Sequence, residues 1–373
     1  TYLLTRDVTK MLAVLMVDFS CALKLAMPIA VLSAMRESSS YHISVKGGRF
    51  LEAVSKADTV VFDKTGTLTY ATPKVAQIVT FGGHEASEML RLAACLEEHY
   101  PHSMANAVVD EAKRQNLKHE EYHSQVQYVV AHGISSMVEG KKVLIGSAHF
   151  VFEDEGCTIP EGEQEKFDSL PAQYSHLYLC IAGELAAVIC IYDPLRAEAK
   201  DAIRALHACG ISKVVMMTGD NRRTAASVAE EVGVDEFYAE VLPEDKAAFI
   251  RREKAAGRMV IMIGDGVNDS PALSEADAGV AISTGAAIAR EIADITIASE
   301  DLFELVTLRK ISEALMGRIH RNYRFIVGFN LGLIVFGVAG LLPPTTSALL
   351  HNASTLAISL KSMTNLLPDK KKI

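Results

Sequence analysis

The 373-residue chain has no tryptophan, and its six cysteines form neither a Cys-x-x-Cys pair nor a zinc-finger spacing. This cysteine pattern favours reduced thiols in a cytoplasmic protein for all of them but Cys21. Apart from Lys370–Lys372, no run of basic residues occurs, and the net charge is −9, so nucleic acid is not expected as a partner. The sequence begins without Met and lacks a signal-peptide pattern, and we interpret it as a fragment.

Three long apolar stretches are present, at about 10–35, 325–342 and 345–367. Each is near the ~20 residues that cross a bilayer as a helix. The third alone also suits a buried soluble helix, but the second needs a return partner after its Pro-Pro turn, which favours a membrane hairpin. Basic residues flank this hairpin on both sides, at Arg318, His320, Arg321, Arg324 and Lys370–Lys372. The positive flanks predict a multi-pass membrane protein whose block 37–310 is cytoplasmic.

The block between the first two apolar stretches alternates short apolar runs with helical patterns. We expect strands at 59–62, 212–217 and 259–263, and helices at 196–208 and 223–232. This alternation predicts a doubly wound parallel sheet. The segment from Tyr70 to about Ala187 differs, with helices near 85–97 and 103–115 before strand-like pieces near 127–138 and 142–145. We therefore expect an inserted domain there.

The string Asp63-Lys64-Thr65-Gly66-Thr67-Leu68-Thr69 directly follows the first expected strand. A carboxylate at the C-terminal end of a parallel strand lies where ligands bind and can act as a nucleophile. We predict that Asp63 is phosphorylated and that Lys64 helps to hold the phosphates. Haloacid-dehalogenase-type phosphatases carry a second Asp two positions after the nucleophile, as general acid and base. Thr65 stands there instead, so a phosphorylated Asp63 is expected to persist.

A second motif, Gly264-Asp265-Gly266-Val267-Asn268-Asp269, follows the strand at 259–263. Carboxylates flanked by glycines at a strand end suit Mg²⁺, which prefers hard oxygen ligands. We predict a magnesium site formed by Asp63, Thr65, Asp265 and Asp269, with Asn268 behind the direct ligands. The metal would neutralise charge on the transferred phosphoryl group.

A third motif, Thr218-Gly219-Asp220-Asn221, follows the strand at 212–217. The Thr218 hydroxyl and the backbone N–H groups at Gly219 and Asp220, together with the charge of Lys246, are predicted to hold the phosphoryl oxygens. Asp193 and Arg196 are candidate nucleotide contacts. The alternative for Asp193-Pro194 is a helix N-terminal cap.

In this order, the strings DKTGTLT, TGDN and GDGVNDSPAL resemble the P-type ATPase superfamily over nearly the whole chain. The resemblance implies an aspartyl phosphate formed from MgATP, in a haloacid-dehalogenase-like α/β phosphorylation domain with an inserted α+β nucleotide-binding domain. Combined with the apolar stretches, it predicts about three transmembrane helices. The expected boundaries are 1–36 for a transmembrane helix with an ion site, 37–70 and 188–310 for the phosphorylation domain, 71–187 for the nucleotide-binding domain and 318–369 for a transmembrane hairpin.

The nucleotide segment is similar to that of the heavy-metal, or CPx-type, branch. Tyr100-Pro101-His102-Ser103 stands where that branch has Ser-Glu-His-Pro, whose His meets the adenine. The resemblance places His102 at the ATP, with Ser103 in place of the Pro. It adds Glu97, from an upstream acidic position, and Gly133, the retained glycine of a Gly-x-Gly loop. Only two expected spans follow the phosphorylation domain, whereas calcium and sodium pumps have six.

Phe19-Ser20-Cys21-Ala22-Leu23 stands where the branch has Cys-Pro-Cys-Ala-Leu, so one thiol remains. A single thiol argues against a purely soft cation such as Cu(I). The string His351-Asn352-Ala353-Ser354-Thr355 resembles the His-Glu-Gly-Ser-Thr pattern of cobalt- and iron-type pumps. The predicted ligands of the transported ion, a divalent metal such as Zn, Co, Cd or Fe, are Cys21, Asp18, His351, Ser354 and Thr355. The alternative for Asp18 is that Lys24 neutralises it.

The sequence contains no Thr-Gly-Glu, the loop that positions water for dephosphorylation in the actuator domain of this superfamily. We therefore expect the chain to bind ATP and become phosphorylated, but not to complete transport alone. The leading hypothesis is ATP-driven export of a transition-metal cation. A soluble haloacid-dehalogenase-type phosphatase is the enzyme alternative, and a truncated remnant that only binds ATP is the non-enzyme alternative.

Overall fold

The computed structural model describes residues 6–70, 72–99, 103–117, 127–129, 133–265, 269–282, 291–298 and 301–368, without the side chains at 19–21, 103 and 127–129. Contacts divide the chain into two compact units. The first unit comprises residues 1–61, 201–213 and 243–373, and the second comprises 62–200 and 214–242. The predicted domain boundaries remain predictions.

Within the described residues, a seven-stranded sheet has the strand order β1-β13-β12-β11-β2-β9-β10. Its strands are β1 (Ile43–Val45), β2 (Thr59–Asp63), β9 (Lys213–Met217), β10 (Glu236–Tyr238), β11 (Val260–Gly264), β12 (Ala278–Ile282) and β13 (Ile295–Ile297). The pairs β9–β10, β11–β12 and β12–β13 are parallel, as predicted, whereas β1 runs antiparallel to β13 at the edge. All five residues of β2 and of β11 are buried, as expected for strands covered on both faces.

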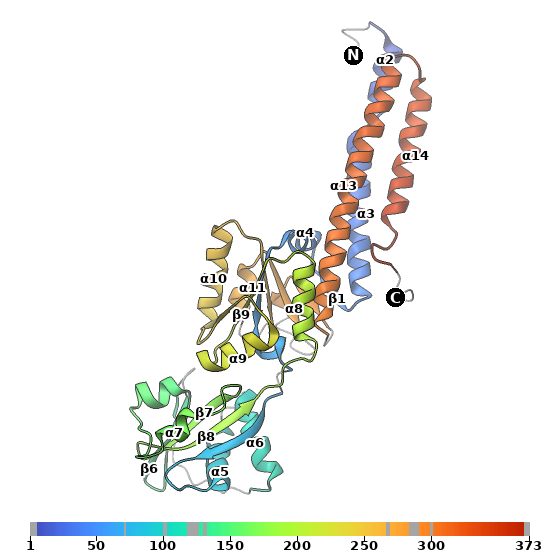
Figure 1. The fold of residues 1–373 in the computed structure, drawn as a ribbon. Helices are drawn as coiled ribbons and strands as arrows, with labels where there is room; N and C mark the ends of the chain where they lie inside the picture. Colours follow the sequence, from blue (N-terminus) through green and yellow to red (C-terminus); the bar gives the residue numbers. More distant parts are fainter. Residues whose placement is uncertain are drawn as a thin grey trace. The chain divides into compact units, whose positions relative to one another are not determined.

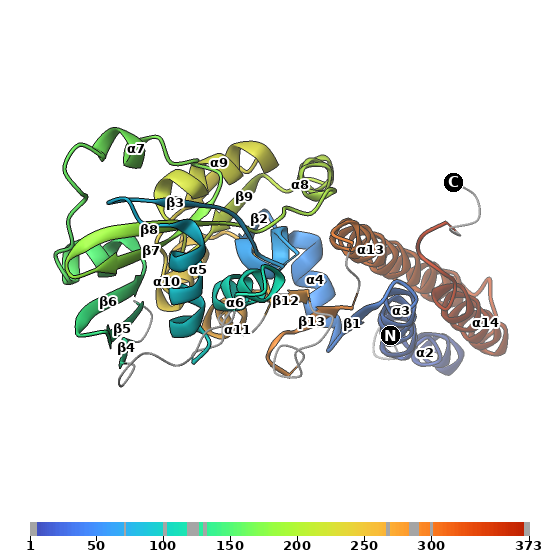
Figure 2. The ribbon, with the colours of Figure 1, turned by 90° about the horizontal axis from the view of Figure 1, so that it is seen from below.

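In the part that the structure describes, the first unit contains both short helices and three long ones. They are α2 (Val8–Leu15), α3 (Phe19–Ser39), α4 (Gly48–Lys56), α8 (Ala199–Ala208), α10 (Pro243–Ala255), α11 (Ser270–Glu275), α13 (Phe303–Val338) and α14 (Pro344–Ser362). The helices α3, α13 and α14 run side by side in both ribbon views (Figures 1 and 2). Among the described residues, none of the helices combines the length and the apolar character needed to span a bilayer.

The helices formed by the long apolar stretches begin and end at positions that differ from expectation. The stretch at 10–35 was expected to be one helix but forms two, because α2 ends at Leu15 and α3 starts at Phe19, directly after the exposed Asp18. Asp is a residue type that favours the position before a helix start. In contrast, α13 runs 36 residues without a break. It contains no proline, and Pro343 follows only after it has ended.

Arg309 ties the start of α13 to the rest of the first unit. Its guanidinium donates to the carbonyl oxygens of Val54 and Ala57 at the end of α4, the latter at 3.1 Å. It also donates to the carbonyl of Cys209, after α8, at 3.3 Å. Carbonyls at a helix end lack partners within the helix, so a buried cation there satisfies them.

The second unit contains a six-stranded antiparallel sheet of order β3-β8-β7-β6-β5-β4 in the described chain. Its strands are β3 (Lys74–Thr80), β4 (Gln127–Val129), β5 (Gly133–Val138), β6 (Lys141–Gly146), β7 (Ser175–Ile181) and β8 (Glu184–Tyr192). The strand-like region expected at 127–138 is therefore two strands. The chain enters through β3 and leaves through β8, which pair with each other, an arrangement that suits an inserted segment.

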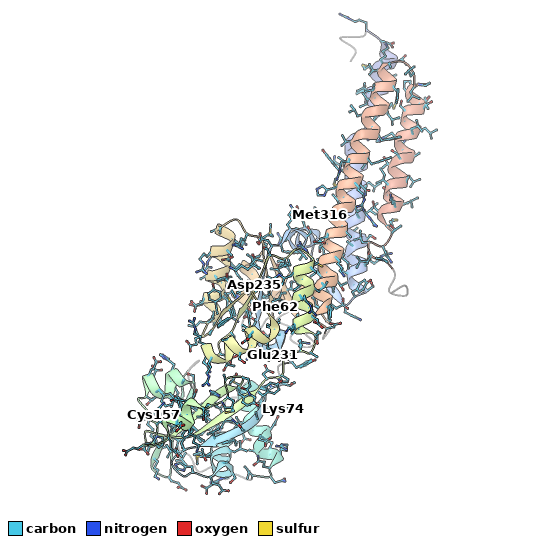
Figure 3. All side chains as sticks on the ribbon, in the orientation of Figure 1. Phe62, Lys74, Cys157, Glu231, Asp235 and Met316 are labelled. Carbon is cyan, nitrogen blue, oxygen red and sulfur yellow. The ribbon has the colours of Figure 1, made fainter. Side chains whose placement is uncertain are left out.

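Short helices complete the second unit. They are α5 (Ala86–Glu97), α6 (Ser103–Arg114), α7 (Gln164–Asp168) and α9 (Arg222–Val232), with helical turns η1 (Lys64–Leu68) and η2 (His149–Asp154). The helices α5 and α6 pack on the six-stranded sheet at β3 and β8. An aromatic group that includes Phe81, Phe150 and Tyr178 packs in a separate hydrophobic cluster, to which Cys157, labelled in Figure 3, also belongs.

Candidate active site

Asp63 ends β2 and is followed by the tight turn η1. The preceding Phe62, labelled in Figure 3, is fully buried, and Asp63 is 8% exposed. Gly66 has φ +75°, a conformation that favours glycine, and its N–H donates to Thr69 Oγ1 at 3.0 Å. The N–H of Thr69 donates to the Lys64 carbonyl at 3.2 Å and closes the turn. The motif residues thus fold back on themselves directly after the candidate nucleophile.

In the second unit, a polar cluster links Lys64 to the third motif. Lys64 Nζ forms an ion pair with Asp220 Oδ2, and both side chains are largely buried. The hydroxyl of Thr218 donates to the same carboxylate oxygen at 3.1 Å, and the Asp220 N–H donates to Thr218 Oγ1 at 3.1 Å. Ser175 Oγ donates to the other oxygen, Oδ1, at 3.0 Å. The structure therefore brings together the predicted residues Lys64, Thr218 and Asp220.

The electrostatics of this cluster keep Asp220 ionised. Burial alone would raise the pKa of Asp220, but the Lys64 charge and the hydrogen bonds from Lys64, Ser175 and Thr218 more than offset it, so the pKa lies below the ordinary Asp value. A carboxylate paired with Lys64 fixes the ammonium group in a buried position. Such a fixed cation can stabilise charge on a phosphoryl group.

Asp193 and Arg196 support the turn that follows Asp63. Burial raises the pKa of Asp193, while a hydrogen bond from the Thr69 side chain and the charge of Lys64 oppose the shift. Arg196 is buried, and its Nε donates to the Thr67 carbonyl at 2.8 Å. The alternative of a helix cap at Asp193-Pro194 is wrong, because α8 begins only at Ala199.

In the first unit, Asp269 lies just before α11, and Lys246 belongs to α10. Lys246 Nζ is 2.7 Å from Asp269 Oδ1, and both residues are buried. The other oxygen, Asp269 Oδ2, has no hydrogen-bond partner within the described residues. A Cβ added at Gly264 would stand 2.5 Å from Oδ2, so the glycine leaves the space that this oxygen occupies.

A buried carboxylate oxygen without a hydrogen-bond partner is the kind of ligand that Mg²⁺ prefers, so Asp269 fits a magnesium site. In the part of the chain that the structure covers, no three His, Cys, Asp or Glu side chains stand close enough to hold a metal by themselves. Asn268 lies outside the described residues, and Asp265 follows β11 in a half-buried position.

The residues predicted to contact the nucleotide are only partly described. His102 lies outside the described residues. Glu97 ends α5 with 2% exposure. Gly133 starts β5, and a Cβ added there would meet the Ile145 carbonyl and stand 2.6 Å from Phe150 Cδ1. Close packing is thus a sufficient reason for glycine at this position.

The residues predicted to bind the transported ion are only partly described. The side chain of Cys21 lies outside the description, and Asp18 is exposed. His351 is buried in α14, but the hydroxyls of Ser354 and Thr355 donate back to its carbonyl, at 2.8 and 2.9 Å. The side-chain partner of His351 is Asn330 of α13, with 3.1 Å between His351 Nδ1 and Asn330 Oδ1.

Sequence reasoning missed Asn330 and Ser175. Each contacts a predicted residue from a distant part of the chain, since Asn330 precedes His351 by 21 residues and Ser175 precedes Asp220 by 45. Asn330 offered a local signal, because an amide inside an apolar stretch is costly unless it has a partner. Ser175 offered none.

Comparisons with known proteins identify the family of the chain. The haloacid dehalogenase-like hydrolase family matches residues 57–277. A manganese-exporting P-type ATPase of Mycobacterium tuberculosis is 35% identical over 95% of this chain and 50% of its own length. A copper-transporting ATPase 2 of Rhizobium meliloti is 39% identical over 91% of this chain and 40% of its own length. The chain thus spans about half the length of the curated relatives it matches.

Two solved structures are also similar. A zinc-transporting PIB-type ATPase in the E2.Pi state has a TM-score of 0.69 and 31% identity, over 92% of this chain and 55% of that one. The catalytic domain of the CPx-ATPase CopB-B has a TM-score of 0.58 and 30% identity, over 74% of this chain and 98% of that one. The chain belongs to the haloacid dehalogenase-like hydrolases and, within them, to the heavy-metal P-type ATPases.

Proposed function

We propose that this chain is the catalytic part of an ATP-driven pump for a transition-metal cation, and that ATP phosphorylates Asp63. The observation that carries the proposal is the position of Asp63 at the end of a buried strand, directly before Lys64, whose ammonium is held by Asp220. Thr65 stands where a phosphatase of this fold would carry its acid–base Asp. We therefore favour a pump with a long-lived aspartyl phosphate over a phosphatase, which would hydrolyse this intermediate quickly.

In the proposed reaction, an Asp63 carboxylate oxygen attacks the γ-phosphorus of ATP and ADP leaves. Lys64 stabilises charge on the phosphoryl oxygens, and Thr218 holds Asp220 in the orientation that faces Lys64. When bound, Mg²⁺ would be held by Asp63, Thr65, Asp265 and Asp269, with Asn268 behind them, and would neutralise phosphate charge. The backbone N–H of Gly219 is proposed to donate to the phosphoryl oxygens, and Lys246 holds Asp269.

Labelled ATP tests this proposal directly. The chain is incubated with γ-labelled ATP, quenched in acid and treated with hydroxylamine, which cleaves acyl phosphates. We expect hydroxylamine-sensitive label on the chain, at least 100-fold less in Asp63→Asn and an unchanged amount in the control Asp201→Asn, an exposed residue of α8. A chain that never takes up label, or an equally labelled Asp63→Asn variant, would contradict the proposal.

For the nucleotide, we propose contacts from His102, Glu97 and Gly133, with Asp193 and Arg196 acting through the turn after Asp63. The experiment is ATP affinity of His102→Ala, measured by isothermal titration, with exposed His149→Ala as the control. A decrease of about tenfold in affinity is expected for the loss of one ring contact. An unchanged affinity would remove His102 from the site.

We further propose that α3, α13 and α14 lie in a membrane, with the phosphorylation and nucleotide-binding segments between α3 and α13 in the cytoplasm. Large apolar side chains are exposed on all three helices, among them Leu25, Leu32, Leu331, Val335, Phe336, Leu349, Leu356 and Leu360. Such a surface needs an apolar environment, which lipid would supply. Co-sedimentation of the chain with liposomes tests this, and a chain that stays in the supernatant without detergent would contradict it.

For the cargo, we propose a borderline divalent cation, such as Zn, Co, Cd or Fe, with His351, Asn330, Cys21 and Asp18 as its candidate ligands. His351, Asn330 and Ser347 are 5%, 1% and 0% exposed, and the Ser347 hydroxyl oxygen has no hydrogen-bond partner in the described chain. The orientation of Ser354 and Thr355 makes their hydroxyls weaker candidates than we expected.

Direct metal binding in detergent tests the cargo site. We expect His351→Ala and Asn330→Ala each to weaken Zn²⁺ binding at least tenfold. Asn352→Ala, a change of the exposed neighbour of His351, is the matched control and leaves binding unchanged. Equal affinities of the three variants would place the cation elsewhere.

A further inference from the structure

The two oxygens of the Asp220 carboxylate have different partners. Oδ2 accepts from Lys64 and Thr218, whereas Oδ1 accepts from Ser175 Oγ at 3.0 Å. Lys64 and Thr218 belong to motifs of the reaction. Ser175 belongs to neither motif, yet its hydroxyl fixes the rotation of the same carboxylate.

The position of Ser175 is set by the six-stranded sheet. It is the first residue of β7 and pairs with Ile191 of β8, two residues before Asp193. The preceding residue, Tyr174, offers its carbonyl oxygen to the Thr224 hydroxyl at 2.8 Å. The start of β7 therefore holds the region of the third motif at two points, Asp220 and Thr224.

The turn that carries Asp220 is fastened on its other sides as well. Asn221 caps α9 by accepting from the Thr224 N–H at 2.9 Å. The carbonyl of Asp220 accepts from Glu240 N–H at 2.9 Å, and the carbonyl of Thr218 accepts from Val241 N–H at 3.1 Å. Backbone contacts thus fix the turn, and Ser175 adds the contact that orients its carboxylate.

We propose that Ser175 is a positioning residue for phosphoryl transfer, which holds the Asp220 carboxylate so that Lys64 faces the phosphate. The inference rests on the proposed phosphorylation of Asp63. Without the Ser175 hydroxyl, Oδ1 of a buried carboxylate loses its donor, and the carboxylate can rotate to take Lys64 with either oxygen. The ammonium then leaves the position from which it stabilises the transferred group.

The experiment compares single-turnover phosphorylation rates of the chain at saturating γ-labelled ATP. We expect Ser175→Ala to slow the rate about tenfold, as for one lost hydrogen bond to a charged group, with ATP affinity within about twofold of the original. Ser175→Thr retains the hydroxyl and restores the rate to within about threefold. Ser169→Ala removes an exposed hydroxyl that donates to the Lys166 carbonyl, and it is the matched control.

A double-mutant cycle with Asp220→Asn separates positioning from a general structural role. If Ser175 acts through Asp220, adding Ser175→Ala to Asp220→Asn changes the rate less than about twofold. The inference is overturned if Ser175→Ala leaves the rate unchanged, or if it slows the original chain and the Asp220→Asn variant by the same factor. In either case, label on the original chain still supports the proposed function. Absence of label on the original chain overturns both.

Discussion

Lys246 Nζ and Asp269 Oδ1 stand 2.7 Å apart in the first unit, with side-chain exposures of 7% and 1%. An ion pair this deeply buried loses most of the hydration of both charges, so each partner depends on the other. The pair joins α10 to the start of α11, directly after the glycine-rich motif.

Breaking this pair from one side is expected to be costly. Lys246→Met leaves the Asp269 carboxylate buried without its cation, and we expect a loss of about 3–5 kcal/mol in the free energy of unfolding. Urea unfolding followed by circular dichroism measures it. The double change Lys246→Met, Asp269→Leu is expected to recover much of the loss, and Arg204→Met, at an exposed pair with Asp201, changes little. If Lys246→Met is as stable as the original chain, the ion pair does not contribute to the unfolding free energy and the prediction is wrong.

Gly133 is expected to resist substitution for steric reasons. Gly133→Ala would place a methyl group against the Ile145 carbonyl and 2.6 Å from Phe150 Cδ1, so the sheet must shift. We expect a loss of about 1–3 kcal/mol in unfolding free energy, measured in urea. Gly328→Ala, in α13 with open space around the added atom, is the control and causes no loss. If both variants unfold at the same urea concentration, the packing argument fails.

The buried Tyr178 contributes stability to the second unit that is lost at alkaline pH. Burial raises its pKa to about 12, so the folded state favours the neutral phenol. The contribution is complete below the ordinary Tyr pKa of about 10 and is lost as pH rises towards 12, by up to about 3 kcal/mol.

Unfolding in urea at several pH values between 9 and 12 measures this contribution. As pH rises, the unfolding free energy of the original chain should fall more than that of Tyr178→Phe. Tyr192→Phe, a change at an exposed ring at the end of β8, is the matched comparison. Parallel curves for the original chain and Tyr178→Phe would refute the prediction.

Arg309 is expected to hold α13 in place. Arg309→Met removes the guanidinium donors to the carbonyls of Val54, Ala57 and Cys209, so these carbonyls lose their charged partner. We expect a loss of about 2–4 kcal/mol in the unfolding free energy of the first unit, measured in guanidinium. The neighbouring Lys310→Met, at an exposed position, is the control. A loss no larger than that of the control would count against this role.

The sequence predicted the regular parts of the fold well where a local pattern exists. The strands expected at 59–62, 212–217 and 259–263 correspond to β2, β9 and β11 within one residue at each end. Continuous apolar runs bounded by polar motifs carry this information. The strand β1, with three residues and an antiparallel partner, carries no such pattern and was not expected.

Contacts between distant residues were the part that sequence reasoning could not supply. Lys64 and Asp220 were each assigned from a motif, but the ion pair between them became visible only in the structure. The hydroxyls of Ser354 and Thr355 fitted a ligand pattern, yet helix geometry lets each bond to the carbonyl of His351, three or four residues earlier. Local hydrogen bonding thus competes with ligand binding in a way that a motif does not reveal.

The uninterrupted helix α13 carries both Arg309 and Asn330. Their separation of 21 positions in the sequence corresponds to about 32 Å along the helix axis. A continuous helix resists stretching, so a sliding movement of its Arg309 end arrives at Asn330 with nearly the same amplitude. A movement at one end of α13 would then reach the other end as a rigid-body shift of the helix, without a series of side-chain rearrangements.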